Sequence, residues 1–487
     1  MTGSEMTGHQ VAAARFRLST LAADCGGQLV GADCDIARVH TDTRSIAAGD
    51  LFVALRGERF DGNAFAADAL AAGAVAALVE RADALPPGAS GIFVADARLA
   101  LGAIARAHRQ RVNPKLLAVT GSNGKTTVKE MLATILRHAH GDAAVLATEG
   151  NLNNDIGLPL TLLRLEPGHR YAVCEMGMNH AGEIAYLCGV AEPDIAVVNN
   201  AGTAHLENLG SLEGIARAKG EIVQGLREGG VAVLPQTDRW LALWQTLAGS
   251  RRVLRFGLDA AAEIAGAASP DNTVTLCHGG QTAACHLATP GVHNAHNACA
   301  AVAAAVAAGV PLAQAAAALD GFGATRSQGT KGRLQVKRAA NGAVVIDDTY
   351  NANPDSARAA IAVLAAASRP RILVLGDMGE LGSNGPALHH EVGAAARAAG
   401  LESLLTTGTL SRETVASFGP GGEHFASHAE LTAALRDRLT PDTTVLVKGS
   451  RFMRMEQVVD ALVAPTSAAS GGAAAPGVTR KEAAACC

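Results

Sequence analysis

Short apolar runs alternate with helical patterns along most of the chain, and glycine or polar residues follow each run. A short aliphatic run bounded in this way is typical of a buried strand, whereas apolar residues three or four positions apart indicate a helix. The alternation favours an α/β fold with parallel sheets, in which ligands bind beyond the carboxyl ends of the strands. The predicted strands are 116–119, 171–174, 195–198, 344–346, 372–375 and 445–447.

Breaks in these patterns divide the chain into segments. Asn113-Pro114 follows a helical pattern that ends at Arg111, and the residue before a proline disfavours helix. The polar stretch 325–332 marks a second boundary, and the Ala, Gly, Ser and Pro composition after Val463 is typical of a disordered tail. The predicted segments are an N-terminal tail (1–15), three domains (16–113, 114–328 and 329–463) and a C-terminal tail (464–487).

The longest uncharged stretch, 298–319, does not predict a membrane span. It contains Gln314 and is interrupted by Gly309-Val310-Pro311, so we expect two helices of a globular protein instead. The N-terminal residues lack the continuous apolar core of a signal peptide. We therefore expect a cytoplasmic protein without disulfides.

Length and charge narrow the class of protein. At roughly 150 residues per domain, 487 residues predict about three domains. The 41 Lys and Arg residues nearly balance the 45 Asp and Glu residues and form no basic stripe, which argues against nucleic acid as a partner. With 48% hydrophobic and 18% charged residues, the composition excludes a disordered chain or a coiled coil.

The nine cysteines include no C-x-x-C pair. Cys277-His278 and Cys285-His286 resemble a set of zinc ligands, but Gly279-Gly280 between them predicts the turn of a two-stranded hairpin. We therefore expect buried free thiols here rather than a metal site.

A phosphate-binding loop is predicted between the strand 116–119 and a helix that carries Val128, Met131 and Leu132. Backbone N–H groups of such a loop and the helix N-terminus bind phosphate oxygens, while lysine adds charge and a threonine hydroxyl can ligate Mg²⁺. The motif departs from the usual pattern because Val119 occupies the position of its first glycine. The candidate loop residues are Gly121, Ser122, Asn123, Gly124, Lys125, Thr126 and Thr127.

Three residues outside the loop are candidates for the same site. Glu175 follows the strand 171–174 and could reach a metal beside the phosphates, although a helix-capping or salt-bridged glutamate is the alternative. His205 follows the next strand, in a loop where a histidine is usually solvated or packed. Lys219 lies on the apolar stripe of a helix, so its amine either reaches solvent or is held by a specific charge.

In combination, the motifs resemble the Mur ligase family over about residues 16–463. The resemblance implies an α/β fold with three domains: an N-terminal domain for a uridine nucleotide, a central domain with a P-loop ATPase-like parallel sheet, and a C-terminal Rossmann-like domain for the incoming amine. The matching segments are 42–45, 51–65, 120–127, 148–159, 174–177, 205, 218–221, 291–297, 332–334, 347–356, 376–381 and 448–451.

The resemblance implies ATP and Mg²⁺ as cofactors. Thr126 and Glu175 would hold one magnesium ion, and Lys219, converted to a carbamate, would hold another with His205. Lys125 and Arg333 would meet the transferred phosphate, so Lys125, His205, Lys219 and Arg333 are the candidate catalytic residues. Asn294 and Asn297 would contact adenine, unless they cap their helix, and either Asp348 or its neighbour Asp347 would lie at the ATP ribose.

The substrate contacts implied by the resemblance come from the N-terminal, central and C-terminal segments. Arg44 and Arg59 would meet the charge of the uridine nucleotide. Asn353 would bind a dipeptide or act as a helix N-cap, and the sequence leaves both roles open. The candidate substrate-binding residues are Thr43, Arg44, Ser45, Phe60, Asp61, Thr148, Asn151, Asn154 and Asn353.

The implied reaction is ATP-dependent amide formation through an acyl phosphate. The segment 348–354 and the FDGNAF segment favour the branch of the family that joins D-alanyl-D-alanine to UDP-N-acetylmuramoyl-tripeptide, and we expect a monomer. The alternatives are a Mur-type ligase that adds a single amino acid and a nucleotide-dependent switch that makes no bond. The third residue of the tripeptide, diaminopimelate or lysine, stays open.

Overall fold

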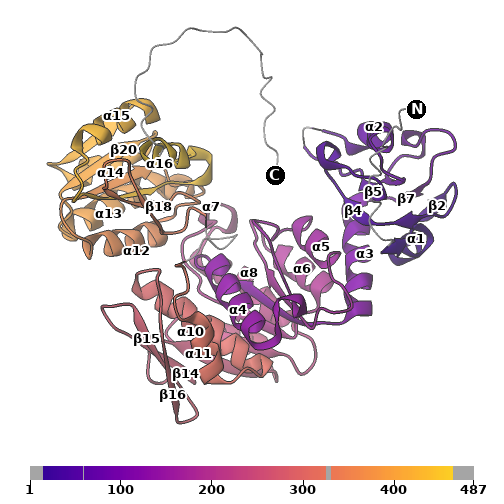
Figure 1. The fold of residues 1–487 in the computed structure, drawn as a ribbon, viewed down its shortest axis with the longest axis horizontal. Coiled ribbons are helices and arrows are strands. Elements are labelled where there is room, and N and C mark those ends of the chain that lie inside the picture. The colour runs from indigo at the N-terminus through magenta and orange to yellow at the C-terminus, as the bar shows by residue number, and fades with distance from the viewer. Residues whose placement is uncertain (1–14, 59, 325–330, 464–487) are drawn as a thin grey trace, which may run out of the picture.

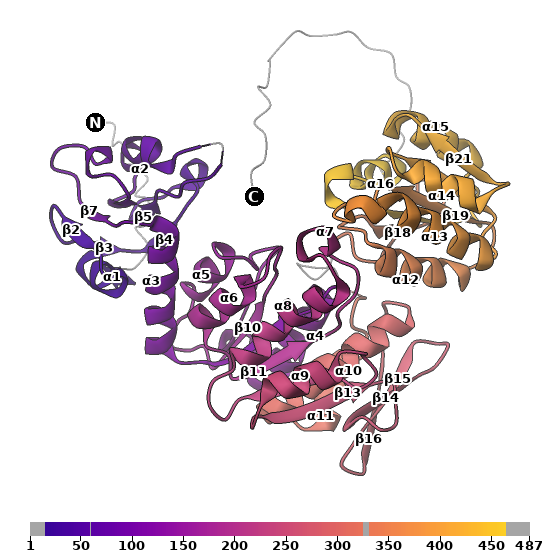
Figure 2. The same cartoon turned by 180° about the vertical axis from the view of Figure 1, so that it is seen from behind.

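The computed structural model describes residues 15–58, 60–324 and 331–463. The chain forms three bodies, each built around its own principal sheet, which we call the N-terminal, central and C-terminal bodies. Figures 1 and 2 show the central body at the base, with the other two standing apart on either side of it. Both predicted tails, apart from Arg15, lie outside the described residues, as does most of the predicted boundary 325–332.

The N-terminal body contains a five-stranded sheet in the order β2-β7-β6-β5-β4, in which β4 to β7 are parallel. The short strands β1 and β3 form a separate antiparallel pair. The elements are β1 (Phe16–Arg17), α1 (Leu18–Cys25), β2 (Gln28–Val30), β3 (Asp35–Ile36), β4 (Arg38–His40), β5 (Asp50–Val53), α2 (Ala66–Ala71), β6 (Ala76–Val79) and β7 (Gly91–Phe93).

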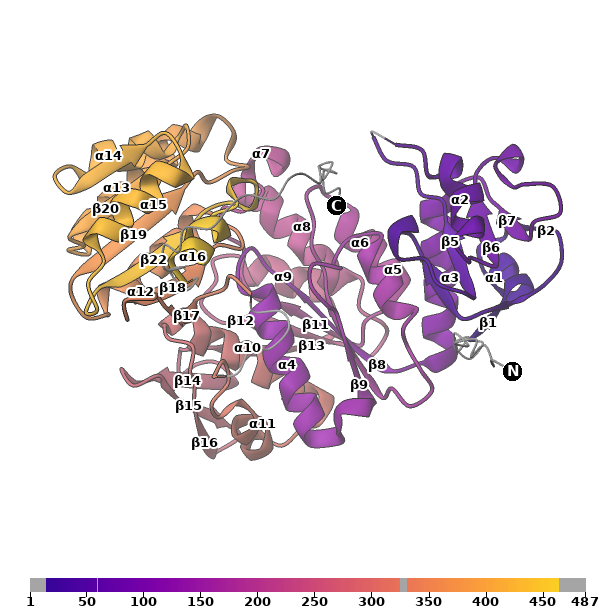
Figure 3. The ribbon, with the colours of Figure 1, turned by 45° about the horizontal axis from the view of Figure 1, so that its top comes forward.

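Helix α3 (Ala97–Val112) connects the N-terminal body to the central body. It packs against α1 on one side and against α5 and α6 on the other, as Figure 3 shows. One apolar core runs through this junction, since Leu21, Ile104 and Leu158 belong to the same buried cluster. The helix ends just before Asn113-Pro114, where the sequence predicted a break.

The central sheet has nine strands in the order β16-β15-β14-β13-β12-β11-β8-β10-β9. All strands from β9 to β14 in this order are parallel, and only β15 and β16 are antiparallel. The strands are β8 (Lys115–Thr120), β9 (Val145–Ala147), β10 (Tyr171–Glu175), β11 (Ile195–Val198), β12 (Val231–Pro235), β13 (Arg252–Gly257), β14 (Ile264–Ala268), β15 (Thr273–His278) and β16 (Gln281–His286).

Helices cover both faces of this sheet, as burial of two apolar faces requires. One face packs against α5 (Gly157–Leu162), α6 (Glu183–Ala191), α8 (Leu212–Gln224) and α9 (Leu241–Ala248). The other packs against α4 (Lys125–His140), α10 (Val292–Ala308) and α11 (Leu312–Leu319). The short helix α7 (Leu206–Leu209) lies at the border with the C-terminal body.

The uncharged stretch forms two helices, as predicted, because α10 ends before Gly309 and α11 begins after Pro311. None of the described helices combines the length and the apolar character that crossing a bilayer requires.

The C-terminal body contains a six-stranded sheet in the order β17-β18-β22-β19-β20-β21. Only β17 is antiparallel, and the remaining strands form a Rossmann-like parallel sheet covered by helices on both faces. The elements are β17 (Gln335–Arg338), β18 (Val344–Asp348), α12 (Pro354–Ala365), β19 (Arg371–Gly376), α13 (Gly385–Ala398), β20 (Ser403–Thr407), α14 (Ser411–Phe418), β21 (Gly422–Phe425), α15 (His428–Arg438), β22 (Thr444–Lys448) and α16 (Glu456–Val463).

The structure confirms every strand predicted from the apolar runs. It also confirms the hairpin around Gly279-Gly280, where β15 pairs with β16. The seven described cysteines are free thiols, but the prediction that both hairpin thiols are buried was wrong for Cys277. Cys277 and Cys285 lie on opposite faces of the hairpin, and only Cys285 faces the core.

Candidate functional site

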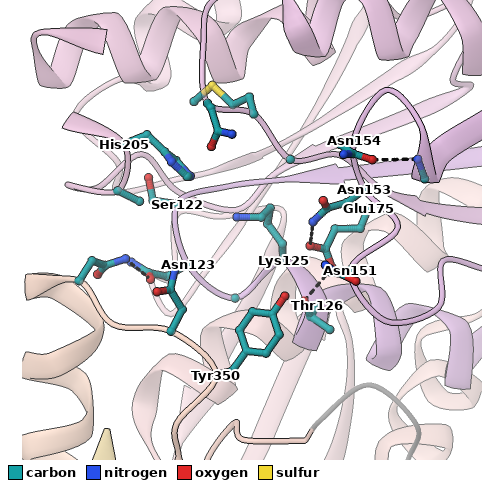
Figure 4. Close-up of a pocket in the computed structure, with 18 of the residues that line it drawn as sticks. Ser122, Asn123, Lys125, Thr126, Asn151, Asn153, Asn154, Glu175, His205 and Tyr350 are labelled. Atoms are coloured by element: carbon teal, nitrogen blue, oxygen red, sulfur yellow. Dashed lines mark hydrogen bonds between the residues drawn. The ribbon is translucent and has the colours of Figure 1, made fainter. Parts of the chain in front are cut away.

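A cavity of about 1650 Å³ lies between the three bodies. Its walls include Thr43 and Phe60 from the N-terminal body, Lys125 from the central body, and Arg333 and Asp348 from the C-terminal body. The floor is at the carboxyl ends of the parallel central strands, where ligands of α/β proteins bind. Figure 4 shows the part of this cavity around the phosphate loop.

The predicted phosphate loop connects β8 to α4 and curls at two glycines with positive φ, Gly121 (156°) and Gly124 (79°). The Ser122 hydroxyl accepts a hydrogen bond from the Gly202 amide (2.9 Å), and the Asn123 amide donates to Asn200 Oδ1 (2.9 Å). The next loop of the sheet thus braces the phosphate loop in a shape that presents backbone N–H groups and the N-terminus of α4.

Lys125 begins helix α4 and extends into the cavity, between Ser122 and Glu175 in Figure 4. Its Nζ donates to the Gly121 carbonyl at 2.7 Å. Burial lowers the pKa of Lys125, and the Glu175 carboxylate opposes that shift by favouring the charged form. The amine is therefore held over the loop where an anion would enter, and a bound anion would favour its charged form.

Thr126 and Glu175 form a direct pair, in which the threonine Oγ1 donates to Glu175 Oε2 at 2.7 Å. The other carboxylate oxygen accepts from Asn153 Nδ2, also at 2.7 Å, and Glu175 is only 2% exposed. These oxygens fit Mg²⁺, which takes a hydroxyl and one or two carboxylates and completes its shell with phosphate oxygens and water. No larger cluster is required, and the described residues contain no group of three or more His, Cys, Asp or Glu side chains that could hold a metal ion.

Thr148, a predicted substrate contact, lies outside the cavity lining. Its hydroxyl accepts a hydrogen bond from the Glu175 amide (3.0 Å), and its carbonyl accepts one from Lys129 Nζ (2.7 Å). Thr148 is 1% exposed, and its hydroxyl and carbonyl both make these internal hydrogen bonds. In this structure the threonine supports Glu175, and its contact with substrate stays a prediction.

Lys219 is buried inside α8 and is only 1% exposed, so the alternative that its amine reaches solvent was wrong. Its Nζ makes no hydrogen bond or ion pair with any residue that the structure describes. Burial lowers the pKa of Lys219 well below its usual value, and the nearby charge of Lys125 lowers it further. The side chain is therefore an amine with an unusually low affinity for protons.

His205 precedes α7 and has a left-handed backbone conformation, with φ of 65°. Its Nδ1 lies 2.7 Å from Glu380 Oε2 of the C-terminal body. The neighbouring His205 lowers the pKa of Glu380. With Nδ1 next to this carboxylate, Nε2 is the ring nitrogen that would remain for a metal, which fits a magnesium-site role.

Asn294 and Asn297 lie in the first turns of α10 and belong to a chain of amides. Asn297 Nδ2 donates to Asn294 Oδ1 (3.3 Å), and Asn297 Oδ1 accepts from Asn199 Nδ2 (2.8 Å). Asn294 Nδ2 donates to the Pro290 carbonyl (2.9 Å), so neither asparagine caps the helix. Both line the cavity beside the phosphate loop.

Arg333 and Asp348 face the cavity from the C-terminal body. The Arg333 guanidinium lies 3.9 Å from the centroid of the Tyr350 ring, a cation–π contact. Asp348 Oδ2 accepts from Lys448 Nζ at 2.7 Å. Asp347 lies outside the lining and pairs with Lys337 at 2.6 Å, since neighbours on a strand face opposite ways. Of the two aspartates, Asp348 is the one that lines the cavity.

Asn353 combines two contacts. Its Oδ1 accepts from the Ser356 amide (2.9 Å) and caps α12, which confirms the N-cap role. Its Nδ2 donates to Asn123 Oδ1 of the phosphate loop (2.8 Å). The side chain thus joins the C-terminal body to the loop and lines the cavity as well.

Some of the candidate substrate residues of the N-terminal body line the cavity, and others make only internal contacts. Thr43, Arg44 and the 46% exposed Phe60 line the cavity. Ser45 and Asp61 do not, because the Ser45 hydroxyl lies 2.8 Å from His40 Nε2 and Asp61 caps the turn at Asn63. Arg59 lies outside the described residues.

In the central body, Asn151 and Asn154, both predicted to bind substrate, line the cavity. Asn154 Oδ1 also accepts the Gly157 amide (2.8 Å) and fixes the start of α5.

Sequence reasoning missed several residues of the site. Asn153 donates a hydrogen bond to Glu175, and the Tyr350 ring makes a cation–π contact with Arg333. Lys448 forms an ion pair with Asp348, and Glu380 lies next to His205. All four lie within segments that carry the family resemblance, but no spacing rule assigns them a partner. Their roles depend on contacts between segments far apart in sequence.

A phosphate loop with a buried hydroxyl–carboxylate pair, at a cavity shared with a Rossmann-like body, defines a nucleotide-dependent enzyme of several domains. The chain belongs to the Mur ligase family. Family profiles match residues 119–305 (Mur ligase middle domain), 332–451 (Mur ligase, glutamate ligase domain) and 35–140 (Mur ligase family, catalytic domain).

Curated relatives and solved structures agree with this assignment. The UDP-N-acetylmuramoyl-tripeptide–D-alanyl-D-alanine ligase of Escherichia coli is 44% identical over 91% of this chain and 98% of its own. A crystal structure of MurF from Acinetobacter baumannii has a TM-score of 0.84 at 36% identity, covering 92% and 98% of the two chains. MurF from Thermotoga maritima, solved in complex with ADP, has a TM-score of 0.77 at 27% identity, covering 88% and 97%.

Proposed function

We propose that this chain joins D-alanyl-D-alanine to UDP-N-acetylmuramoyl-tripeptide, with ATP converted to ADP and phosphate, in peptidoglycan synthesis. The observation that carries the proposal is the Thr126–Glu175 pair beneath a phosphate loop in a cavity that all three bodies line. The relatives that span nearly the whole chain carry this activity in their names.

The proposed arrangement gives each body one ligand. The central domain (114–328) binds ATP, with phosphates on the loop and adenine at Asn294 and Asn297. The N-terminal domain (16–113) holds the uridine nucleotide near Arg44, and the C-terminal domain (329–463) presents the dipeptide. The cavity, which reaches from Thr43 to Asp348, supports this arrangement.

The chemistry must bring together two anions, the peptide carboxylate and the γ-phosphate of ATP. Lys125 would supply a positive charge at the loop, where its Nζ lies, and Arg333 would supply one from the C-terminal body. Bound Mg²⁺ would neutralise phosphate charge at Thr126 and Glu175. The carboxylate would attack the γ-phosphate and release ADP, and the dipeptide amine would then attack the acyl phosphate and release phosphate, while closure of the bodies around the substrates would exclude water.

Lys219 fits conversion to a carbamate in this scheme. A carbamate forms when a neutral amine adds to CO2 and loses a proton, and burial lowers the pKa of Lys219 toward the neutral form. The product would be a carboxylate that, with His205, ligates a second magnesium ion.

We further propose a cytoplasmic monomer, because the nucleotide substrates of this reaction are cytoplasmic. Two other functions remain to be tested against this one: a Mur-type ligase that adds a single amino acid, and a nucleotide-dependent switch.

The test compares UDP-N-acetylmuramoyl-tripeptide with other acceptors, and D-alanyl-D-alanine with single amino acids, and analyses the products by mass spectrometry. We expect an amide product only with the tripeptide and the dipeptide, formed in equal amount with phosphate. Preference for a single amino acid would establish the first alternative, and phosphate release without an amide would establish the second. Running diaminopimelate- and lysine-containing tripeptides in parallel identifies the third residue. Glu175→Gln, which keeps the side-chain shape, should be inactive.

A further inference from the structure

The first turn of α12 holds the C-terminal body against the central body. Asp355 Oδ2 accepts two hydrogen bonds from Thr203, one from the backbone amide (2.8 Å) and one from the hydroxyl (2.9 Å). Next to it, Asn353 reaches Asn123 of the phosphate loop. Thr203 lies in the loop that follows β11 and leads to His205.

Asp355 is well placed to act as a charged acceptor. Its second oxygen, Oδ1, accepts from Arg358 Nη2 at 3.0 Å. Burial opposes ionisation, yet the hydrogen bonds from Thr203 and Arg358 keep the pKa of Asp355 below its usual value. Hydrogen bonds to an ionised acceptor are roughly twice as strong as those between neutral groups.

The central loop is shaped to admit this carboxylate. A Cβ atom at Gly202 would lie 2.4 Å from Asp355 Oδ2, so only glycine allows the approach. The Gly202 amide donates to Ser122 Oγ (2.9 Å), which links the same loop to the phosphate loop. Contacts therefore run without interruption from Ser122 through residues 202–203 to Asp355.

We propose that Asp355 is a positioning residue: it docks the C-terminal body on the 202–203 segment and thereby fixes the loop that carries His205 and braces the phosphate loop. The inference rests on the proposed function for its kinetic part only. Asp355 touches neither the phosphate loop nor His205 and acts through Thr203. The loop reaches its working position only when the C-terminal body is docked.

The rival explanation is local, because a carboxylate in the first turn stabilises a helix through its dipole. Glu413 provides a matched control, since it is an exposed carboxylate in the first turn of α14, in the same body. A helix-dipole role predicts the same outcome for Asp355→Ala and Glu413→Ala. A docking role predicts effects at Thr203 for Asp355→Ala alone.

The first experiment is residue-resolved hydrogen–deuterium exchange on the ligand-free full chain. We expect Asp355→Ala to speed exchange at the Thr203 amide at least 10-fold, and Glu413→Ala to leave it unchanged. The Gly202 amide bonds to Ser122 and not to Asp355, so its exchange should change less than that of Thr203. An unchanged Thr203 amide in Asp355→Ala would overturn the proposal, whether or not the protein is a ligase.

The second experiment measures ligation kinetics in a double-mutant cycle. We expect Asp355→Ala to lower kcat roughly 10-fold, the equivalent of one hydrogen bond to a charged group, with KM for the uridine substrate unchanged. Gly202→Ala should lower kcat similarly, because its methyl group displaces the carboxylate from Thr203. The double variant should lose little more kcat than either single variant, because Asp355→Ala has already removed the carboxylate that the Gly202→Ala methyl group would displace. Fully additive losses would contradict the proposal.

The two experiments distinguish an error in the docking role from an error in the proposed function. If wild type makes no amide product but Asp355→Ala still loosens the Thr203 amide, the proposed function is wrong and the docking contact stands. If wild type ligates normally and both kcat and exchange are unaffected by Asp355→Ala, the docking role is wrong and the function stands.

Discussion

Replacement of Lys219 by methionine should stabilise the protein while abolishing ligation. Methionine fills a similar volume without a polar group, and the Lys219 amine has no hydrogen-bond partner among the described residues. An unsatisfied buried polar group costs about 1–3 kcal/mol, so we expect Lys219→Met to raise the free energy of unfolding by that amount. For a body of this size the melting temperature should rise roughly 2–12 °C.

The sign of the pH dependence follows from the lowered pKa of Lys219. The unfolded lysine keeps an ordinary pKa near 10.5, whereas the folded one titrates well below it. Between the two values the unfolded state binds more protons, so the wild-type protein gains stability as pH rises. The advantage of Lys219→Met should therefore be larger at pH 7 than at pH 9.5.

Lys129→Met provides the matched control. Lys129 is as deeply buried as Lys219, but its amine pairs with Glu130 and donates to the Thr148 carbonyl. Its removal leaves both partners unsatisfied and should destabilise the protein by about 3–5 kcal/mol. Calorimetry in carbonate-free and magnesium-free buffer measures both variants. Shifts of the same sign for the two substitutions, or full ligase activity in Lys219→Met, would refute the reasoning.

Four further outcomes are expected. Lys219→Ala should be nearly inactive and regain activity with added acetate, which can occupy the place of the carbamate. Lys125→Ala should abolish ligation and ATP turnover in a coupled assay, since it removes the charge that meets the transferred phosphate. Arg333→Ala should lower kcat more than ATP affinity, measured by calorimetric titration, because its contact forms mainly in the reacting state. Gly124→Ala should weaken ATP binding at least 10-fold, because the new Cβ would lie 2.4 Å from Asn297 Oδ1 at a φ of 79° that favours glycine.

Local patterns predicted the parts of the fold and site that depend on neighbours in sequence. The apolar runs gave the strands, and the glycine-containing segment after β8 gave the phosphate loop with Lys125 and Thr126 in place. Helical periodicity placed Lys219 on a buried stripe, which the structure confirms. In each case the residues that decide the local structure lie close to one another in the sequence.

Contacts between residues far apart in the sequence could not be predicted from local patterns. The pair Asn123–Asn353 joins residues 230 positions apart, and Thr203–Asp355 spans 152 positions. The burial of Thr148 was not foreseen, because an exposed and a buried threonine look alike in sequence. The choice between Asp347 and Asp348 required the orientation of β18, since adjacent strand residues face opposite ways.

The central body meets the N-terminal and C-terminal bodies through different kinds of contact, and this difference matters for protein engineering. The N-terminal and central bodies share one apolar core through α3, whereas the apolar clusters of the C-terminal body lie wholly within it. Among the described residues, the hydrogen bonds and ion pairs between the central and C-terminal bodies are made by Asn353, Asp355 and Glu380. The C-terminal body can therefore be exchanged as a unit between related ligases with different amine substrates, provided that the graft keeps these three side chains. A chimera cut through α3 would instead divide a hydrophobic core and should fail to fold.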